Sequence, residues 1–566
     1  MGARHRFDRD ESLRRLGDEH FDVLVIGGGA TGAGVALDAA SRGLKTALVE
    51  RHDFADGTSS MSSKMIHGGI RYLQQFEFRL VYQSLSERQR LLRNAPHLVR
   101  VLPFVMAIYT SGGMIPKFLS RLLGPVLWFY DITGGAKIGH KHKRLDRDET
   151  IAHMPVLDPE RIHSGYRYYD AQVDDARMTM AIARTAALDH GAVVANHAPV
   201  IALHKAASGG LTGATIDAGA RGQIEIRAKA VVNATGVWID TVDELDGDTE
   251  RDVRPARGVH VVVPRSLLSN DAAVILSVPG KKASVFAVPW GDHAYIGTTD
   301  TDYDGDLDHP YCTAGDVRFL LDSLNASTTD DITPDDVVGT WAGLRPLLRS
   351  ADDAKTADLS RRHRVTRSDS GLITVAGGKL TTWRQMAEDT VDEVLDLLGR
   401  SAACRTKDLP LHGAVGWDTV SAGGVTASVR DRLVGRYGSD AGTLIELIGQ
   451  EPGLADPLVP GLEYLRAEAV FAARDEMAVT LDDVLSHRTR ARLLARDASA
   501  DAADAVAEIL ASELGWTADE QAAQVRAYRE AIHRERTALE LTAPPGPEPA
   551  RMPGWVPGVA RLGSMR

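Results

Sequence analysis

A segment near the start of the chain, residues 21–50, constrains the fold more than any other. Apolar runs at residues 23–26 and 46–49 predict two buried strands. Between them lie a helix of small residues and three glycines with G-x-G-x-x-G spacing, which are Gly27, Gly29 and Gly32. A strand, a glycine turn, a helix and a second strand in this order predict the first unit of a Rossmann-like dinucleotide-binding domain.

The residue types in this segment suit a ligand that carries a diphosphate. Glycines let the backbone turn tightly beside the phosphates, and the N–H groups at the start of the following helix favour negative charge. Glu50 ends the second strand, where a carboxylate accepts hydrogen bonds from a ribose diol. An acid at this place disfavours the 2′-phosphate of NADP. A tight turn that binds no ligand is the structural alternative.

Length and composition narrow the class of protein. The 566 residues exceed what one hydrophobic core holds and predict about three or four domain-sized units. The formal net charge of −12 argues against a general nucleic-acid binder. The two cysteines, Cys312 and Cys404, predict no disulfide framework and no metal site, and hence a reducing, cytoplasmic setting. We expect no signal peptide, because the charged N-terminus lacks an apolar h-region. We expect no transmembrane helix either, because no apolar run reaches about 18 residues.

Residues 57–73, with the sequence GTSSMSSKMIHGGIRYL, combine hydroxyl groups, glycines and cationic side chains. The hydroxyls donate hydrogen bonds, the glycines admit a flat ring, and Lys64, His67 and Arg71 supply positive charge. The segment therefore predicts an anion or cofactor site. A solvated serine loop is the alternative. An amphipathic helix is predicted next, at residues 74–94.

Residues 99–132 are apolar and aromatic, and cationic side chains interrupt them at Arg100, Lys117 and Arg121. Trp128 and Phe129 beside such cations are typical of a segment that dips into the surface of a bilayer. An ordinary buried helix pair is the alternative, which the sequence alone slightly favours.

The middle of the chain predicts strands and a second cofactor turn. Residues 193–236 predict an antiparallel meander that ends in the small-residue turn at 234–236. Residues 257–345 predict a separate sheet with a hairpin turn at Gly291 and Asp292. Residues 371–383 repeat the strand, glycine turn and helix pattern, which directs a further set of N–H groups at a ligand.

The last part of the chain is predicted to be helical. Beyond about residue 400 the apolar residues recur at helical spacing, and Thr480–Asp483 and Thr517–Glu520 have the form of capping boxes. We expect packing and interface roles here. Residues 543–566 are rich in Pro and Gly and predict a poorly packed tail.

Taken in order, these motifs resemble the flavin-dependent glycerol-3-phosphate dehydrogenases, peripheral membrane enzymes that pass electrons to quinone. The resemblance covers roughly residues 18–395 and is carried by IGGGATGAG, TSSMSSKMIHGGIRYL, YDAQVDDAR, VVNATGVW, GVHVVVP, VPWGDHAYIGTTD, GLRP and GGKLTTW. It is weaker in the helical C-terminal region, around residues 463–495, and the Pro-rich tail departs from it.

The resemblance implies an α/β fold with three structural parts. The first is a Rossmann-like FAD-binding domain of the glutathione-reductase and D-amino-acid-oxidase type, at residues 18–98, 165–256 and 346–398. An antiparallel-sheet substrate domain at residues 99–164 and 257–345 is inserted into it. An all-α C-terminal domain follows at residues 405–542.

The resemblance also implies the site residues. Non-covalent FAD is expected on the two glycine turns, the serine loop and the turn after the meander, at Gly27, Gly29, Ala30, Thr31, Gly32, Glu50, Thr58, Ser59, Ser60, Ser63, His67, Gly68, Gly69, Ala234, Thr235, Gly236, Gly378, Lys379, Leu380 and Thr381. The expected substrate residues are Arg71, Tyr72, His260, Arg345 and Lys379. Of these, Arg71, His260 and Arg345 are the candidate catalytic residues.

The implied reaction is oxidation of sn-glycerol 3-phosphate to dihydroxyacetone phosphate, with hydride transfer from C2 to FAD N5 and electrons passed to a membrane quinone. His260 is the expected base for the C2 hydroxyl, because imidazole titrates near neutrality, and Arg345 is its rival as the group that orients the hydroxyl. We expect a homodimer at the inner face of the cell membrane. The alternatives are an oxidase that reduces oxygen, an amine oxidase of the same fold, and a non-catalytic flavin-bound scaffold.

Overall fold

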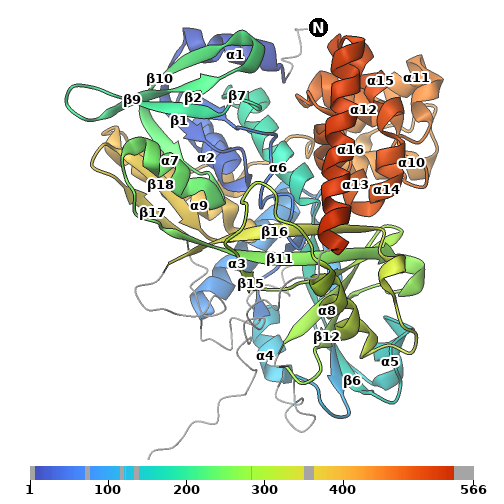
Figure 1. Cartoon of the computed structure of the whole chain (residues 1–566). Helices are drawn as coiled ribbons and strands as arrows, with labels where there is room; N and C mark the ends of the chain where they lie inside the picture. The colour runs from blue at the N-terminus through green and yellow to red at the C-terminus, as the bar shows by residue number, and fades with distance from the viewer. Residues whose placement is uncertain are drawn as a thin grey trace, which may run out of the picture.

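The computed structural model describes residues 7–70, 77–114, 120, 123–132, 139–281, 283–349 and 363–540. Figure 1 shows a mostly parallel sheet with its helices, a second sheet below it, and a bundle of C-terminal helices alongside. The predicted α/β fold with a second sheet and an all-α C-terminal domain is confirmed. The predicted tail at 543–566 lies outside the described residues.

The first sheet carries the glycine-rich segment and has the strand order β17-β18-β10-β1-β2-β7, with β9 paired to β10 and β8 to β9. Strand β1 pairs in parallel with β2 and β10, so Val25 lies between Leu48 and Val232. Its apolar residues are buried, as a parallel sheet covered on both faces requires. The strands are β1 His20–Ile26, β2 Thr46–Val49, β7 Val193–Ala195, β8 Val200–Lys205, β9 Leu211–Asp217, β10 Gln223–Asn233, β17 His363–Arg367 and β18 Leu372–Gly377.

Helices cover this sheet, and glycines in α2 let them approach closely. A Cβ at Gly34 would lie 2.5 Å from Cε3 of Trp383, the first residue of α9, so only glycine permits this contact of α2 with α9. The helices of this part are α1 Arg9–Asp18, α2 Ala30–Ser41, α3 Phe78–Asn94, α6 Asp175–Arg184, α7 Ile239–Asp246 and α9 Trp383–Leu397.

The second sheet has the order β15-β11-β14-β13-β12-β4-β6-β3, with β16 paired to β11 and β5 to β6. The predicted turn at Gly291 and Asp292 joins β13 to β14. The strands are β3 Met65–Ile66, β4 Arg100–Tyr109, β5 Lys143–Leu145, β6 Ile162–Gln172, β11 Val253–Pro264, β12 Ala273–Ser277, β13 Ser284–Trp290, β14 His293–Gly297, β15 Thr301–Asp302 and β16 Gly339–Leu348. Helices α4 Leu123–Tyr130, α5 Arg147–Ala152 and α8 Ala314–Asn325 accompany it.

The boundary predicted at residue 165 differs from the structure. Strand β6 pairs with β4 from one end to the other, so residues 165–172 belong to the second sheet, and the chain returns to the first part only with α6.

The segment at 99–132 was predicted to be either a bilayer-surface segment or a buried helix pair, but it contains a strand and a short helix. Residues 100–109 form β4, because their apolar side chains pair with β6 and β12. Residues 123–130 form α4, which buries Leu123, Leu127 and Tyr130 and exposes Trp128 and Phe129. The side chain of Arg100 packs against Gly435 of α10, because a Cβ at Gly435 would lie 1.9 Å from Arg100 Nη2. Arg100 is therefore directed at the C-terminal helices and not at α4. Lys117 and Arg121 lie outside the described residues.

The C-terminal part packs its own core and also contacts the sheets. Helix α16 buries Val525, Tyr528 and Ile532, and the capping boxes predicted at Thr480–Asp483 and Thr517–Glu520 are both formed. The helices are α10 Ala427–Tyr437, α11 Ala441–Gln450, α12 Arg466–Asp475, α13 Ala491–Leu494, α14 Arg496–Asp501, α15 Ala503–Leu514 and α16 Ala518–Glu540, with a π-helical turn at Asp483–Arg488. Within the described ranges, no helix has both the length and the hydropathy to cross a bilayer.

Candidate active site

A cavity of about 570 Å³ lies where the carboxyl ends of β1, β2, β10 and β18 face the second sheet. Open α/β sheets bind ligands at this edge. Most of the predicted site residues line it, namely Gly27, Gly29, Ala30, Thr31, Glu50, Thr58, Ser59, Ser63, His67, Gly69, Ala234, Thr235, Gly236, His260, Arg345, Gly378, Lys379, Leu380 and Thr381. The predicted residues Arg71 and Tyr72 lie outside the described residues.

The glycine turn after β1 forms a cradle for a diphosphate. Gly27 has a φ of +109°, and a Cβ there would lie 2.7 Å from the carbonyl oxygen of Ala234. Gly29 is the N-cap of α2 and has no side chain to cap the helix. The N–H of Ala30 donates to Ser59, so the N–H groups of Thr31 and Gly32 in the first turn are left for a ligand. Gly32 does not line the cavity. A Cβ at this position would lie 1.9 Å from the carbonyl oxygen of Gly27, so glycine is needed here for packing.

The half-buried carboxylate of Glu50 closes the cradle on the β2 side. It accepts hydrogen bonds from the backbone N–H of Gly28 at 2.6 Å and of His52 at 2.9 Å. Burial raises the pKa of Glu50, and the two backbone donors oppose that effect. Each carboxylate oxygen keeps a further lone pair, which suits the predicted contact with a ribose diol.

The serine loop contributes some, but not all, of the residues predicted for it. Ser59 Oγ accepts a hydrogen bond from the backbone N–H of Ala30 at 2.9 Å, which joins the loop to the start of α2. Ser60 is fully buried and off the cavity wall. Gly68 is also off the wall, because its N–H donates to Tyr130 Oη at 3.0 Å and Leu85 fills the space beside it. The predicted cofactor contacts of Ser60 and Gly68 are therefore not supported.

His260 projects from β11 between two neighbouring strands. It lies opposite Gly297 of β14 and Trp341 of β16, and its ring stacks on Trp341 with centroids 4.6 Å apart. Nε2 lies 2.8 Å from Ser63 Oγ, whereas Nδ1 is buried without a hydrogen-bond partner among the described residues. Burial lowers the pKa of His260 well below its ordinary value, and the charges of Lys64 and Arg345 lower it further. The imidazole is therefore neutral at neutral pH and able to accept a proton.

Arg345 enters the same cavity from β16. Its Nη1 pairs with Asp300 Oδ1 at 3.0 Å, which holds the guanidinium in place. Gly258 makes room for it, because a Cβ there would lie 2.5 Å from Arg345 Nη2. Lys379 lines the cavity from the turn after β18, so two cations and a neutral imidazole line the same cavity.

The sequence analysis did not identify some residues of this site. Asp300 and Trp341 orient Arg345 and His260, and Gly258 and Gly297 leave room for these side chains. Asp300 ends the quoted motif VPWGDHAYIGTTD, which was the available signal. An apolar arm of the cavity was not predicted either, and it is lined by Phe104, Met106, Met114, Ile275 and Phe286.

A glycine cradle at a helix N-terminus, an acid at the end of the next strand and a pocket across the strand ends define a dinucleotide-binding α/β domain. The comparisons agree. Residues 22–390 match the family described as FAD dependent oxidoreductase, and residues 404–521 match the C-terminal domain of alpha-glycerophosphate oxidase.

Relatives of known name match nearly the whole chain. This chain is 41% identical to glycerol-3-phosphate dehydrogenase 2 of Mycobacterium tuberculosis, over 93% of this chain and 90% of the relative. It is 36% identical to the mitochondrial glycerol-3-phosphate dehydrogenase of Bos taurus over 91% of this chain and 73% of the relative.

Solved structures agree as well. The glycerol-3-phosphate dehydrogenase of Bacillus halodurans, complexed with FAD, aligns with a TM-score of 0.76 at 30% identity, covering 94% of this chain and 97% of that chain. The L-alpha-glycerophosphate oxidase of Mycoplasma pneumoniae, at 18% identity and a TM-score of 0.52, shows a shared fold over 68% of this chain and 97% of that chain. The chain belongs to the glycerol-3-phosphate dehydrogenase family of FAD-dependent oxidoreductases. FAD as the cofactor and an enzymatic role are confirmed.

Proposed function

We propose that this enzyme oxidises sn-glycerol 3-phosphate at C2 to dihydroxyacetone phosphate and passes the electrons to a membrane quinone. The observation that carries the proposal is the position of His260, Arg345 and Lys379 in the cavity that contains the FAD cradle. The names of the relatives support the substrate. FAD, when bound, supplies the acceptor for the hydride.

In this proposal His260 takes the proton of the C2 hydroxyl. Nε2 is the nitrogen that accepts it, because Nδ1 is buried. Ser63 also lines the cavity, and its hydroxyl lies 2.8 Å from Nε2, so it is placed to pass the proton on. The lowered pKa of His260 leaves the ring unprotonated over the physiological range, and it also makes the ring a weaker base.

Arg345 and Lys379 bind the substrate in this proposal. A guanidinium binds a phosphate or a developing alkoxide through two parallel N–H groups, whereas an ammonium acts as a point charge. The ion pair of Arg345 with Asp300 fixes the direction of the fork before substrate arrives. Arg71 and Tyr72 stay predictions as further substrate residues.

The apolar arm of the cavity supports a quinone as the acceptor. Tyr168 lines this arm and stacks on Phe104 with centroids 5.4 Å apart, and Tyr130 at the end of α4 meets Tyr168 edge to face at 6.0 Å. Helix α4 therefore backs the arm on one side while it exposes Trp128 and Phe129 on the other.

We infer peripheral membrane contact at this surface, which consists of Phe78 and Tyr82 on α3, Trp128 and Phe129 on α4, and Ile132 just after α4. Figure 1 shows where the two helices lie. Each of these side chains is at least 40% exposed, and the exposed cation Arg79 is next to Phe78 in the sequence. Aromatic residues beside cations suit the boundary between headgroups and acyl chains. The inner face of the cell membrane and a homodimer stay predictions.

The oxidase is the second candidate, because the C-terminal region matches a domain described for alpha-glycerophosphate oxidase. One experiment separates the possibilities. Anaerobic glycerol 3-phosphate should bleach the flavin absorbance of the purified protein, whereas glycerol should not. Turnover should then require a soluble quinone analogue. Stoichiometric hydrogen peroxide in air would instead identify an oxidase, and a flavin that glycerol 3-phosphate leaves oxidised would refute the proposed substrate.

A further inference from the structure

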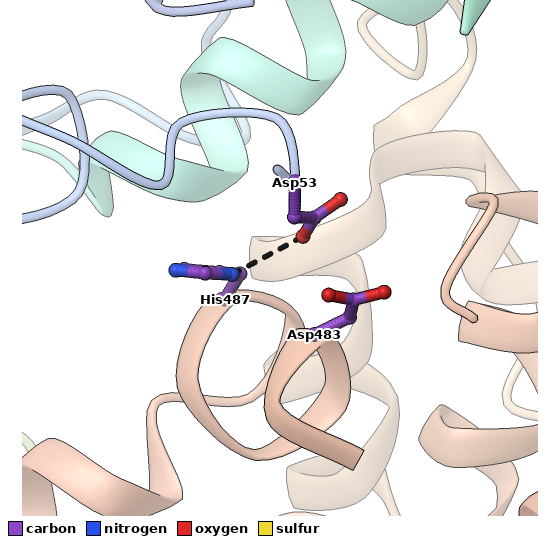
Figure 2. A group of neighbouring side chains, drawn as sticks. All are labelled: Asp53, Asp483 and His487. Carbon is purple, nitrogen blue, oxygen red and sulfur yellow. Dashed lines mark ion pairs between the residues drawn. The ribbon is translucent and has the colours of Figure 1, made fainter. Parts of the chain in front are cut away.

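A cluster of buried charges joins the C-terminal helices to the loop that follows β2. Figure 2 shows Asp53 of that loop together with Asp483 and His487 of the π-helical turn, and the dashed line marks the ion pair of His487 with Asp53. The three side chains each offer one ligand atom within 4.8 Å, a spacing that would suit a metal ion.

The neighbours of the cluster argue against a metal and for an ion-pair clamp. Arg488 places its guanidinium on Asp53, with Nη2 at 2.9 Å from Oδ1 and Nη1 paired to Oδ2. Asp483 already accepts hydrogen bonds from the N–H of Val479 and Thr480 and from His197. The protein's own cations therefore occupy the place that a metal ion would take.

His487 bridges two carboxylates of the loop. Nδ1 lies 3.2 Å from Asp53 Oδ2, and Nε2 lies 3.3 Å from Asp56 Oδ1. Burial lowers the pKa of His487, but the neighbouring carboxylates of Asp53 and Asp56 outweigh this effect and raise it to about 10. The ring is thus an imidazolium at neutral pH, held by two ion pairs with carboxylates of the same loop.

Arg490 fixes the far end of the loop. Its Nη2 donates to the carbonyl oxygen of Ser60 at 2.5 Å and pairs with Asp175 Oδ1 at 2.6 Å. Lys64 Nζ donates to the same carbonyl at 2.7 Å. Arg490 has a φ of +83°, a conformation that persists in a residue other than glycine only where the surroundings impose it.

The part of the loop between these two anchors borders the cofactor cavity. Asp56, Thr58 and Ser59 all line the cavity, and Ser59 accepts the N–H of Ala30 at the start of α2. The loop is therefore fixed from the C-terminal domain at Asp53, Asp56 and Ser60, and it meets the diphosphate cradle between these points.

We propose that His487 and Arg490 of the C-terminal domain are positioning residues of the FAD site, which hold residues 53–60 against the start of α2 so that FAD is retained. The helical domain is then part of the cofactor-binding apparatus, although none of its residues within 405–540 lines the cavity. The role concerns cofactor retention and does not depend on the identity of substrate or acceptor.

The test compares rates of FAD release. Holoenzyme is diluted, and the rise of flavin fluorescence gives the dissociation rate constant for wild type, His487→Gln and Arg490→Gln. Loss of one charged hydrogen bond should raise this rate about tenfold or more. His487→Arg, which keeps the charge and a fork for both carboxylates, should restore a rate near that of wild type.

The matched control is Asp440→Asn, which breaks the ion pair of Arg184 with Asp440 between the same two domains but touches no residue of the loop. Its release rate should stay within about twofold of wild type. Equal release rates in all variants, or the same acceleration in Asp440→Asn as in His487→Gln, would overturn the proposal, because domain docking alone would then explain the effect.

A double-mutant cycle keeps the proposal testable if His487→Gln folds poorly. Asp56→Asn removes the partner of Nε2 at a half-buried position, and its release rate should also rise. If His487 acts through Asp56, the effects of the two changes on the FAD release rate should be less than multiplicative in the double variant. Fully multiplicative effects would contradict this route, as would wild-type FAD release in Asp56→Asn.

Discussion

Substituting Gly297 by alanine should test the catalytic role of His260 by displacing its ring, without replacing His260 itself and without a change at the cavity wall. A Cβ at Gly297 would lie 2.1 Å from His260 Cδ2 and 2.7 Å from Nε2. Ordinary contact begins at 3.4 Å, so the ring must move by more than about 1 Å. Trp341 stacks on the ring at 4.6 Å, which leaves it little space for that movement.

The movement takes Nε2 out of its hydrogen bond with Ser63, now 2.8 Å long. A misplacement of about 1 Å costs on the order of 10²-fold in rate, which corresponds to about 2.7 kcal/mol in the activation free energy. Overpacking in addition should lower the free energy of unfolding by about 1–3 kcal/mol. FAD content should not change, because Gly297 does not line the cavity.

The assay is kcat for glycerol 3-phosphate with a water-soluble acceptor, normalised to bound flavin. Gly449→Ala is the matched control: this glycine lies in α11, and an added Cβ meets nothing within 4 Å. The control should keep its kcat. A Gly297→Ala enzyme with full FAD occupancy and a kcat within twofold of wild type would refute the assignment of His260 as the group that takes the proton.

Three further outcomes follow from the same geometry. Arg345→Ala should lower kcat by on the order of 10²-fold at unchanged FAD content, and an enzyme that kept its kinetics would remove Arg345 from the site. Because both side chains are exposed, Trp128→Ser combined with Phe129→Ser should weaken the salt-resistant binding to anionic liposomes. Activity toward a soluble acceptor is the folding control, and unchanged binding would exclude this surface. The pKa of His487, raised to about 10, predicts stability that is fully present below the ordinary value of about 6.5 and lost as pH rises toward 10. The difference in melting temperature between wild type and His487→Gln should therefore shrink from pH 6.5 to 10, and a constant difference would contradict the raised pKa.

The parts of the fold that the sequence predicted correctly depend on local signals. The strand, glycine turn and helix at 23–43 and the capping box at Thr480–Asp483 are set by neighbouring residues, so periodicity and spacing suffice. Residues 100–109 were not assigned correctly because an apolar run suits a buried helix and a buried strand equally well. Pairing with β6, about 60 positions later in the chain, decides between them.

In the site, too, residues with local signals were predicted, whereas residues placed by distant parts of the chain were not. Residues in glycine turns and at strand ends were predicted because their chemistry matches their position, as with Gly29 and Glu50. Within the serine loop, however, composition gives five similar hydroxyls and cannot say which side each one faces. The fold decides that Ser59 meets α2 whereas Ser60 is buried, and it places Trp341 and Lys64 where they make His260 a neutral base.

The contacts of residues 487–490 could not be predicted from the sequence. Its residues His487, Arg488 and Arg490 read as an ordinary charged stretch at a helix end, yet all three are buried. Their partners stand more than 300 positions earlier in the chain, in the loop after β2 and at the start of α6. Because coupling between two equilibria is reciprocal, a loop that needs the helical domain in order to hold FAD must also make FAD strengthen the docking of that domain. The same coupling free energy therefore describes how much FAD stabilises the interface and how much the interface strengthens FAD binding.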